Sequence, residues 1–144
     1  MSPKINHVAV FVSAIIFFVL SFLWYSFIFG KMYMAQIAAM TGKAPGMPAS
    51  MTVPLIETFL LGWFLSYVIA IALAMRPDPN PAARGFGFGL FIGIGVFASM
   101  SFLGVIWGSL PVGLWAINAG FVTLAMAIMG YIMGAWSKPG TTAV

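Results

Sequence analysis

Four long apolar stretches, each interrupted by at most one acidic or basic side chain, take up most of the chain. They run from Val8 to Phe29, from Val53 to Met75, from Gly85 to Trp107 and from Gly113 to Trp136. At about 1.5 Å per helical residue, each can cross a hydrocarbon core about 30 Å thick. The pattern predicts an all-α integral membrane protein, with four transmembrane helices in a compact antiparallel bundle that forms a single transmembrane domain over residues 1–144.

The composition supports a lipid environment. Of all residues, 62% are hydrophobic and 6% are charged, the reverse of what a water-soluble surface requires. The first stretch ends in Trp24-Tyr25-Ser26 and lacks a small-residue cleavage site, so we interpret it as a retained anchor and not as a signal peptide.

The connections between the stretches differ in kind. Lys31 to Met40 are good helix formers that are followed by Gly42, so we expect a short interfacial helix in the first outer loop. The second connection, Arg76 to Pro81, has alternating prolines that oppose a helix and favour a stiff extended turn. Asp78 in this turn is expected to pair with Arg76 or Arg84.

The basic residues predict an orientation. In a four-helix hairpin arrangement, one side of the membrane carries Lys4, Arg76, Arg84 and Lys138, and the other carries only Lys31 and Lys43. By the positive-inside rule both termini are therefore cytoplasmic. Six scattered cations favour contact with lipid head groups and not with nucleic acid.

Glycines recur at a spacing that is typical of helix packing. Gly85, Gly89 and Gly93 share one face of the third stretch, and Gly130 and Gly134 repeat the spacing in the fourth. Missing side chains let another helix approach closely and add dispersion contacts that lipid cannot replace. The spacing does not decide between helices of one chain and helices of two chains.

Polar residues fall in one layer beneath the outer face. Ser26 and Glu57 lie about 6 Å below the outer ends of their helices, and Asn118 about 7 Å below its own. Trp24 and Tyr25 lie near this level and can each donate a hydrogen bond.

Glu57 has two interpretations. It is either a carboxylate favoured by the helix dipole near interfacial water, or a buried functional group paired with a donor of the layer or with Lys31 or Lys43. For Asn118 we expect a hydrogen bond between helices.

The chain lacks the groups for most catalytic sites. It has one histidine, two acidic residues and no cysteine, so one copy cannot assemble a zinc site, a carboxylate pair or a Ser-His-Asp triad. We therefore expect no enzyme, no metal and no cofactor. The methionines of the outer loop could bind Cu(I) through thioethers, but apolar contacts with lipid explain them better. They are Met32, Met34, Met40, Met47 and Met51.

Three segments carry a resemblance to a known family. Their sequences are WYSFIFGK from Trp24 to Lys31, INAG from Ile117 to Gly120, and GYIMGAW from Gly130 to Trp136. In these segments and over nearly its full length the chain resembles the bacterial membrane-protein family called domain of unknown function 1761. The resemblance implies four spans and a place in the bacterial inner (cytoplasmic) membrane. The family's signature positions correspond to Trp24, Tyr25, Ser26, Gly30, Lys31 and Asn118, although Phe27 replaces the usual proline.

Two functional classes follow. The favoured one is a small structural or accessory subunit that packs through its glycine-rich faces with its own copies or with a larger membrane complex. The alternative is an oligomeric channel, carrier or small-ligand binder with an outer-facing polar site around Glu57 and Asn118. A translocation path needs polar groups at mid-depth, where the sequence offers only hydroxyls such as Ser99 and Ser101.

Overall fold

Every regular element in the described part of the chain is a helix. The computed structural model describes residues 5–43, 52–76 and 78–137. In chain order the elements are α1 (His7–Leu23), η1 (Trp24–Ile28), α2 (Gly30–Thr41), α3 (Thr52–Met75), α4 (Pro81–Leu90), η2 (Phe91–Ala98), α5 (Ser99–Trp107) and α6 (Val112–Ala135), where η marks a π-helix.

The four predicted spans are confirmed to within a few residues. Four helices are long and apolar enough to cross a membrane, and they are His7–Ile28, Thr52–Met75, Pro81–Trp107 and Val112–Ala135. The third begins before the predicted Gly85, because proline is tolerated at the first helical position and Asn80 caps the helix by accepting a hydrogen bond from the Ala83 amide.

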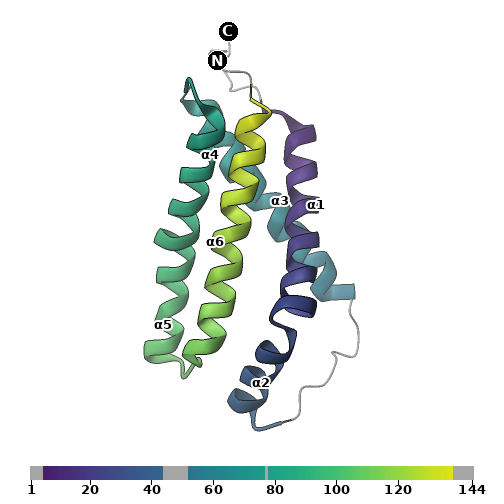
Figure 1. Ribbon diagram of the computed structural model, residues 1–144, viewed down its shortest axis with the longest axis vertical. Helices are drawn as coiled ribbons and strands as arrows, with labels where there is room; N and C mark the ends of the chain where they lie inside the picture. The colour runs from purple at the N-terminus through teal and green to yellow at the C-terminus, as the bar shows by residue number, and fades with distance from the viewer. Residues whose placement is uncertain (1–4, 44–51, 77, 138–144) are drawn as a thin grey trace.

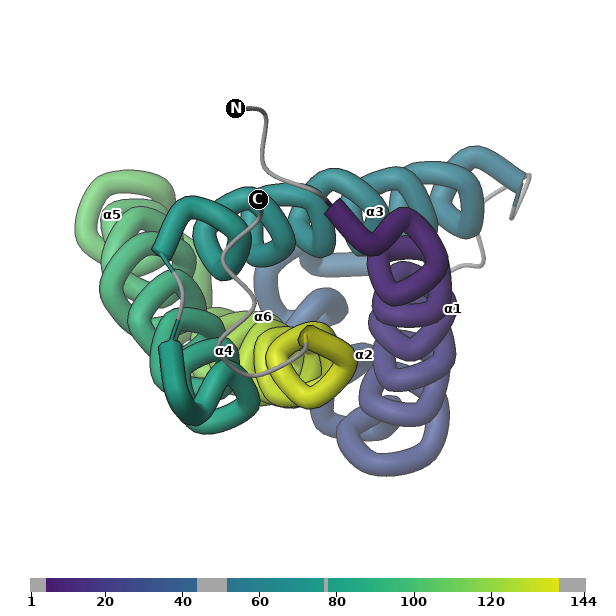
Figure 2. The backbone as a smooth tube through the Cα atoms, turned by 90° about the horizontal axis from the view of Figure 1, so that it is seen from above, coloured from purple at the N-terminus to yellow at the C-terminus, as the bar shows by residue number. Residues whose placement is uncertain are grey.

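The spans alternate in direction around α6 (Figure 1). Seen from above, α6 lies between α4 and α1, and α3 runs across one side of the molecule (Figure 2). α3 is oblique to the other spans, so its start projects past α1 while its end lies near α4. The start of α1 and the end of α6 share one end of the molecule, and α2 lies at the other, which we call the α2 end.

The short helix predicted after the first span is confirmed as α2. Gly42 ends it in the left-handed conformation, with φ of 66°, and donates its amide to the Ala38 carbonyl. This backbone conformation is one that glycine adopts without steric cost. The position of α2 on a membrane surface stays a prediction.

The connection between α3 and α4 is held by capping and not by an ion pair. The Asp78 carboxylate accepts a hydrogen bond from the Asn80 amide at 2.8 Å, and Arg84 Nη2 donates to the Ala72 carbonyl of α3 at 3.1 Å. The expected pairing of Asp78 with Arg76 or Arg84 is therefore replaced in the described residues by bonds to backbone groups. Lys4 and Lys138, which entered the orientation argument, lie outside these residues.

The predicted glycine faces meet each other within one chain, along a contact between α4–η2 and α6 that we call the glycine seam. A methyl group on Gly85 would collide with the Gly130 carbonyl, and one on Gly89 with the Met126 carbonyl. Gly93 lies against Thr123, and Gly134 lies against the Pro81 carbonyl. The two backbones touch at these positions. The glycine face of the third span therefore packs against α6 of the same chain, whereas the glycine spacing alone allowed packing within one chain or between two chains.

The remaining core lies where α1, α3 and α6 meet. Its largest fully buried side chains include Phe17, Ile69, Met126 and Met129. Phe17 of α1 fills the space beside Gly62 of α3, where a β-carbon would collide with the ring. These contacts hold α1 and α3 together and position the end of α1 against α6.

A matched pair of substitutions in α4 tests the glycine seam. Gly89→Ala should lower the free energy of unfolding in bicelles by about 1–3 kcal/mol, because the added methyl group forces α4 away from α6. Gly87→Ala is the control, since a β-carbon there meets nothing within 4 Å. Equal stability of the two variants would show that the backbones do not touch.

Candidate functional site

The first span ends in a π-helical turn that the sequence did not predict. In η1 the Phe29 amide donates to the Trp24 carbonyl at 2.9 Å, five residues back. Such turns insert an extra residue into a helix and are frequent at functional sites. Gly30 comes next, and its α-carbon lies close to the Tyr25 carbonyl group. A β-carbon at Gly30 would lie 3.1 Å from the Tyr25 carbonyl oxygen.

Two side chains of η1 bind α6, and we call this pair of bonds the Tyr25–Asn118 contact. Tyr25 Oη donates to Asn118 Oδ1 at 2.8 Å. Trp24 Nε1 donates to the Ile117 carbonyl at 3.1 Å. The two acceptors are adjacent along α6, so the Trp24 and Tyr25 donors are both satisfied by one turn of the neighbouring helix. The hydrogen bond expected of Asn118 is present in this form.

Aromatic rings enclose the Tyr25–Asn118 contact. Phe121 lies 5.3 Å from Tyr25 and 6.2 Å from Trp24 between ring centroids, and Tyr33 of α2 packs edge-on to Tyr25 at 4.9 Å. Phe121 and Tyr33 are not among the site residues predicted from the sequence. Phe121 stands three residues after Asn118, a spacing that puts both on one helical face and could have identified it.

Two other predicted site residues, Ser26 and Lys31, do not take part in this contact. Ser26 and Lys31 are exposed, although they stand next to Tyr25 and Gly30 in sequence. Successive side chains of a helix point in different directions, so a shared depth does not bring these residues together. The contact therefore contains three of the predicted polar residues, Trp24, Tyr25 and Asn118.

The methionines proposed as alternative copper ligands are only partly described. Met32, Met34 and Met40 are exposed along α2. Met47 and Met51 lie outside the described residues.

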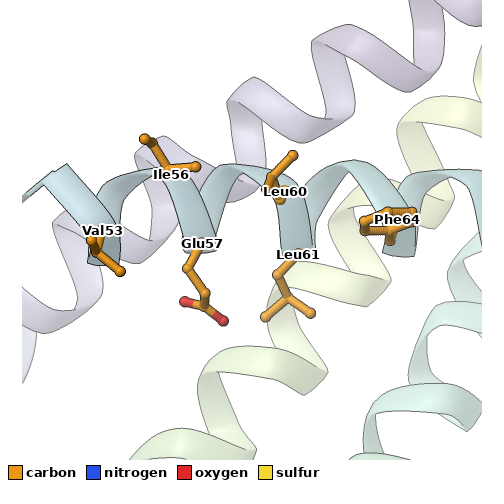
Figure 3. Close-up of a pocket in the computed structure, with 6 residues that line it drawn as sticks. All are labelled: Val53, Ile56, Glu57, Leu60, Leu61 and Phe64. Atoms are coloured by element: carbon orange, nitrogen blue, oxygen red, sulfur yellow. The ribbon is translucent and has the colours of Figure 1, made fainter.

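Glu57 lies apart from Asn118, in a groove along α3. The groove has a volume of about 420 Å³, and its described lining comes from one helix: Val53, Ile56, Glu57, Leu60, Leu61 and Phe64. Figure 3 shows the carboxylate on the same side of α3 as Leu61. Glu57 is exposed, and no ion pair or hydrogen bond of its carboxylate is present within residues 5–43, 52–76 and 78–137. We call this surface the Glu57 groove.

The two features have different chemical capacities. The Tyr25–Asn118 contact uses two donors and two acceptors to fasten the first span to the last, beside aromatic rings. The Glu57 groove offers a negative charge among apolar side chains, where Coulomb attraction to a cation is stronger than in bulk water. The first feature fastens two spans together, and the second leaves an exposed charge without a described partner.

Apolar spanning helices joined by backbone contacts and a few hydrogen bonds define a multi-pass α-helical membrane protein. The chain belongs to the family described as Protein of unknown function (DUF1761), whose model matches residues 8–134. The match covers nearly all of the four spans together with both features, and it confirms the resemblance noted in the sequence. No curated protein and no solved structure matches the chain.

A double-mutant cycle tests the Tyr25–Asn118 contact. Tyr25→Phe and Asn118→Ala should show a coupling energy of about 0.6 kcal/mol, and at most about 1.7 kcal/mol, in reversible unfolding in bicelles, because each removes the same hydrogen bond.

The matched control uses Tyr131, an exposed tyrosine of α6. Tyr131→Phe combined with Asn118→Ala should give no coupling. A coupling no larger for Tyr25 than for Tyr131 would show that the bond is not formed in the membrane.

Proposed function

We propose that the chain is a non-catalytic structural or accessory subunit of the membrane, which packs with another transmembrane helix at the Glu57 groove. The observation that carries the proposal is an exposed carboxylate, without a described partner, in an apolar groove within a spanning helix. The partner helix is expected to carry a cationic side chain at the same depth.

The chemistry of the groove supports a charged partner. A carboxylate is costly inside a bilayer unless it is protonated, hydrated or paired. Glu57 stands in the second turn of α3, beyond the first turn in which the helix dipole stabilises a carboxylate. A cation on a neighbouring helix would offset this cost, and the apolar lining would pack around the stem of that side chain.

The spacing of the lining residues supports a helical partner. Val53, Glu57, Leu60 and Phe64 follow one another at intervals of three or four residues, so they form one stripe along α3. This is the arrangement by which one helix packs against another. The glycine-rich faces are occupied inside the chain, so a partner is expected to use this stripe instead.

A carrier or channel receives less support from the geometry. The side-chain oxygen of Asn118, Oδ1, already accepts a hydrogen bond from Tyr25, and the described lining of the Glu57 groove includes no residue of α6. The hydroxyls of Ser99 and Ser101 donate to the carbonyls of Ile94 and Ala98 in their own span. These bonds leave little for a polar path at mid-depth.

The orientation is part of the proposal. Arg76 follows α3 and Arg84 lies in the first part of α4, at the end of the molecule opposite α2. Lys31 lies in α2, and Lys43 follows it. We assign the arginine end to the cytoplasm by the positive-inside rule, in a bacterial inner membrane, so that the Glu57 groove lies in the outer half of the bilayer.

Photo-crosslinking tests whether the groove binds a helix. A photoreactive residue at Leu60 of the full chain, in native membranes, should give adducts with polypeptide. The same residue at Leu103 should give adducts with lipid, because Leu103 is comparably exposed but belongs to α5. Glu57→Ala should reduce the polypeptide adduct, because it removes the charge that attracts the partner.

Asp78→Asn is the control for charge, since Asp78 lies outside the spans and should leave the adduct unchanged. Lipid adducts alone at Leu60 would contradict the proposed function. So would a polypeptide adduct that Glu57→Ala does not weaken.

A further inference from the structure

We infer that the helix bound in the Glu57 groove belongs to a second copy of this chain, and that it presents Lys31. The inference rests on the proposed function and specifies its partner. It joins two exposed side chains of opposite charge at the α2 end of the molecule, neither of which has a described partner within its own chain.

The surroundings of Lys31 complement the groove. Phe27 is 73% exposed, Ile28 is 62% exposed and Met32 is 56% exposed, so large apolar side chains that are close to Lys31 in sequence are exposed around the junction of η1 and α2. We call this surface the Lys31 knob. The groove has the opposite charge and an apolar lining, so the two surfaces match in both charge and polarity.

The depth of the two charges is also compatible. Copies that share one orientation in a bilayer are related by rotation about the membrane normal, so residues that pair between copies must lie at similar depths. Lys31 follows the end of the first span, and Glu57 stands in the second turn of the next. The flexible lysine stem can cover the remaining difference by reaching along the apolar surface.

The position of the elements favours a contact between unlike surfaces. The start of α3 projects past α1 at the edge of the molecule, whereas α2 lies behind the spans, between α6 and α1, in the view from above (Figure 2). A contact between unlike surfaces, repeated by rotation about the membrane normal, forms a ring when the rotation angle divides a full turn evenly. We therefore infer a cyclic oligomer in which each knob enters the groove of the next copy.

The absence of cysteine from the chain makes this contact testable by disulfide formation. Phe27→Cys combined with Leu60→Cys places one thiol on the knob and one in the groove. Oxidation in membranes should give a ladder of dimers and larger products. Co-expressed single variants, one carrying each cysteine, should give dimers and nothing larger, because each chain then has one thiol.

Phe27→Cys combined with Leu103→Cys is the control, since Leu103 is exposed on α5 and should not cross-link. A ladder no stronger than in this control would overturn the inference.

Charge reversal tests the Lys31–Glu57 pair itself. In the double-cysteine chain, Glu57→Lys or Lys31→Glu alone should lower the cross-linked fraction by about tenfold, which corresponds to about 1.4 kcal/mol of association free energy. The two reversals together should restore it, and restoration also shows that the variants fold.

The outcomes separate the inference from the proposed function. If photo-crosslinking at Leu60 captures polypeptide in a Glu57-dependent way but neither the ladder nor the restoration is seen, the partner is another protein and the inference fails alone. If Leu60 captures only lipid, the proposed function fails, and the inference fails with it.

Discussion

Direct contact between the backbones of α4 and α6 is the interaction on which the rest of the structure depends. Lipid tails are as apolar as leucine, so apolar side chains gain little by leaving lipid for another helix, and close approach must supply the attraction. Gly85 and Gly130 provide it because neither has a side chain to hold the helices apart. The third span is thereby fastened to α6, which becomes the element against which the other spans are arranged.

The first span is fastened to α6 by different means. Trp24 and Tyr25 reach α6 from the π-helical turn η1, and their hydrogen bonds lie among aromatic rings at the α2 end of the molecule. α3 packs on α1, where Gly62 receives the ring of Phe17, and it crosses the bundle obliquely. Its start therefore projects past α1, and the carboxylate of Glu57 stands in the groove on this projecting part.

Features that depend on distance along the chain could be predicted from the sequence. The four spans and the helix ended by Gly42 follow from hydropathy and from local propensity. The glycine spacing predicted a packing face, and the structure brings Gly89 of that face against α6. The depth argument likewise selected Tyr25 and Asn118, which are bonded to each other.

Features that depend on direction around a helix axis could not be predicted in the same way. Depth places Glu57 and Asn118 in one layer but does not say which way each side chain points or how far α3 tilts. The inserted residue of a π-helical turn rotates the side chains that follow it around the helix axis, and the hydropathy pattern does not reveal this rotation. These two effects explain why Glu57, Ser26 and Lys31 do not join the Tyr25–Asn118 contact.

Solid-state NMR of glycine-labelled protein in bilayers gives the most direct test of the central claim, that the glycine seam closes within one chain. With ¹³C at both glycine carbons, a cross-peak should join the Gly85 α-carbon to the Gly130 carbonyl carbon. Its intensity relative to one-bond peaks should not change when labelled chains are diluted with unlabelled chains. A cross-peak that fades on dilution would show that the glycines join different copies, and a missing cross-peak would show that α4 and α6 do not touch.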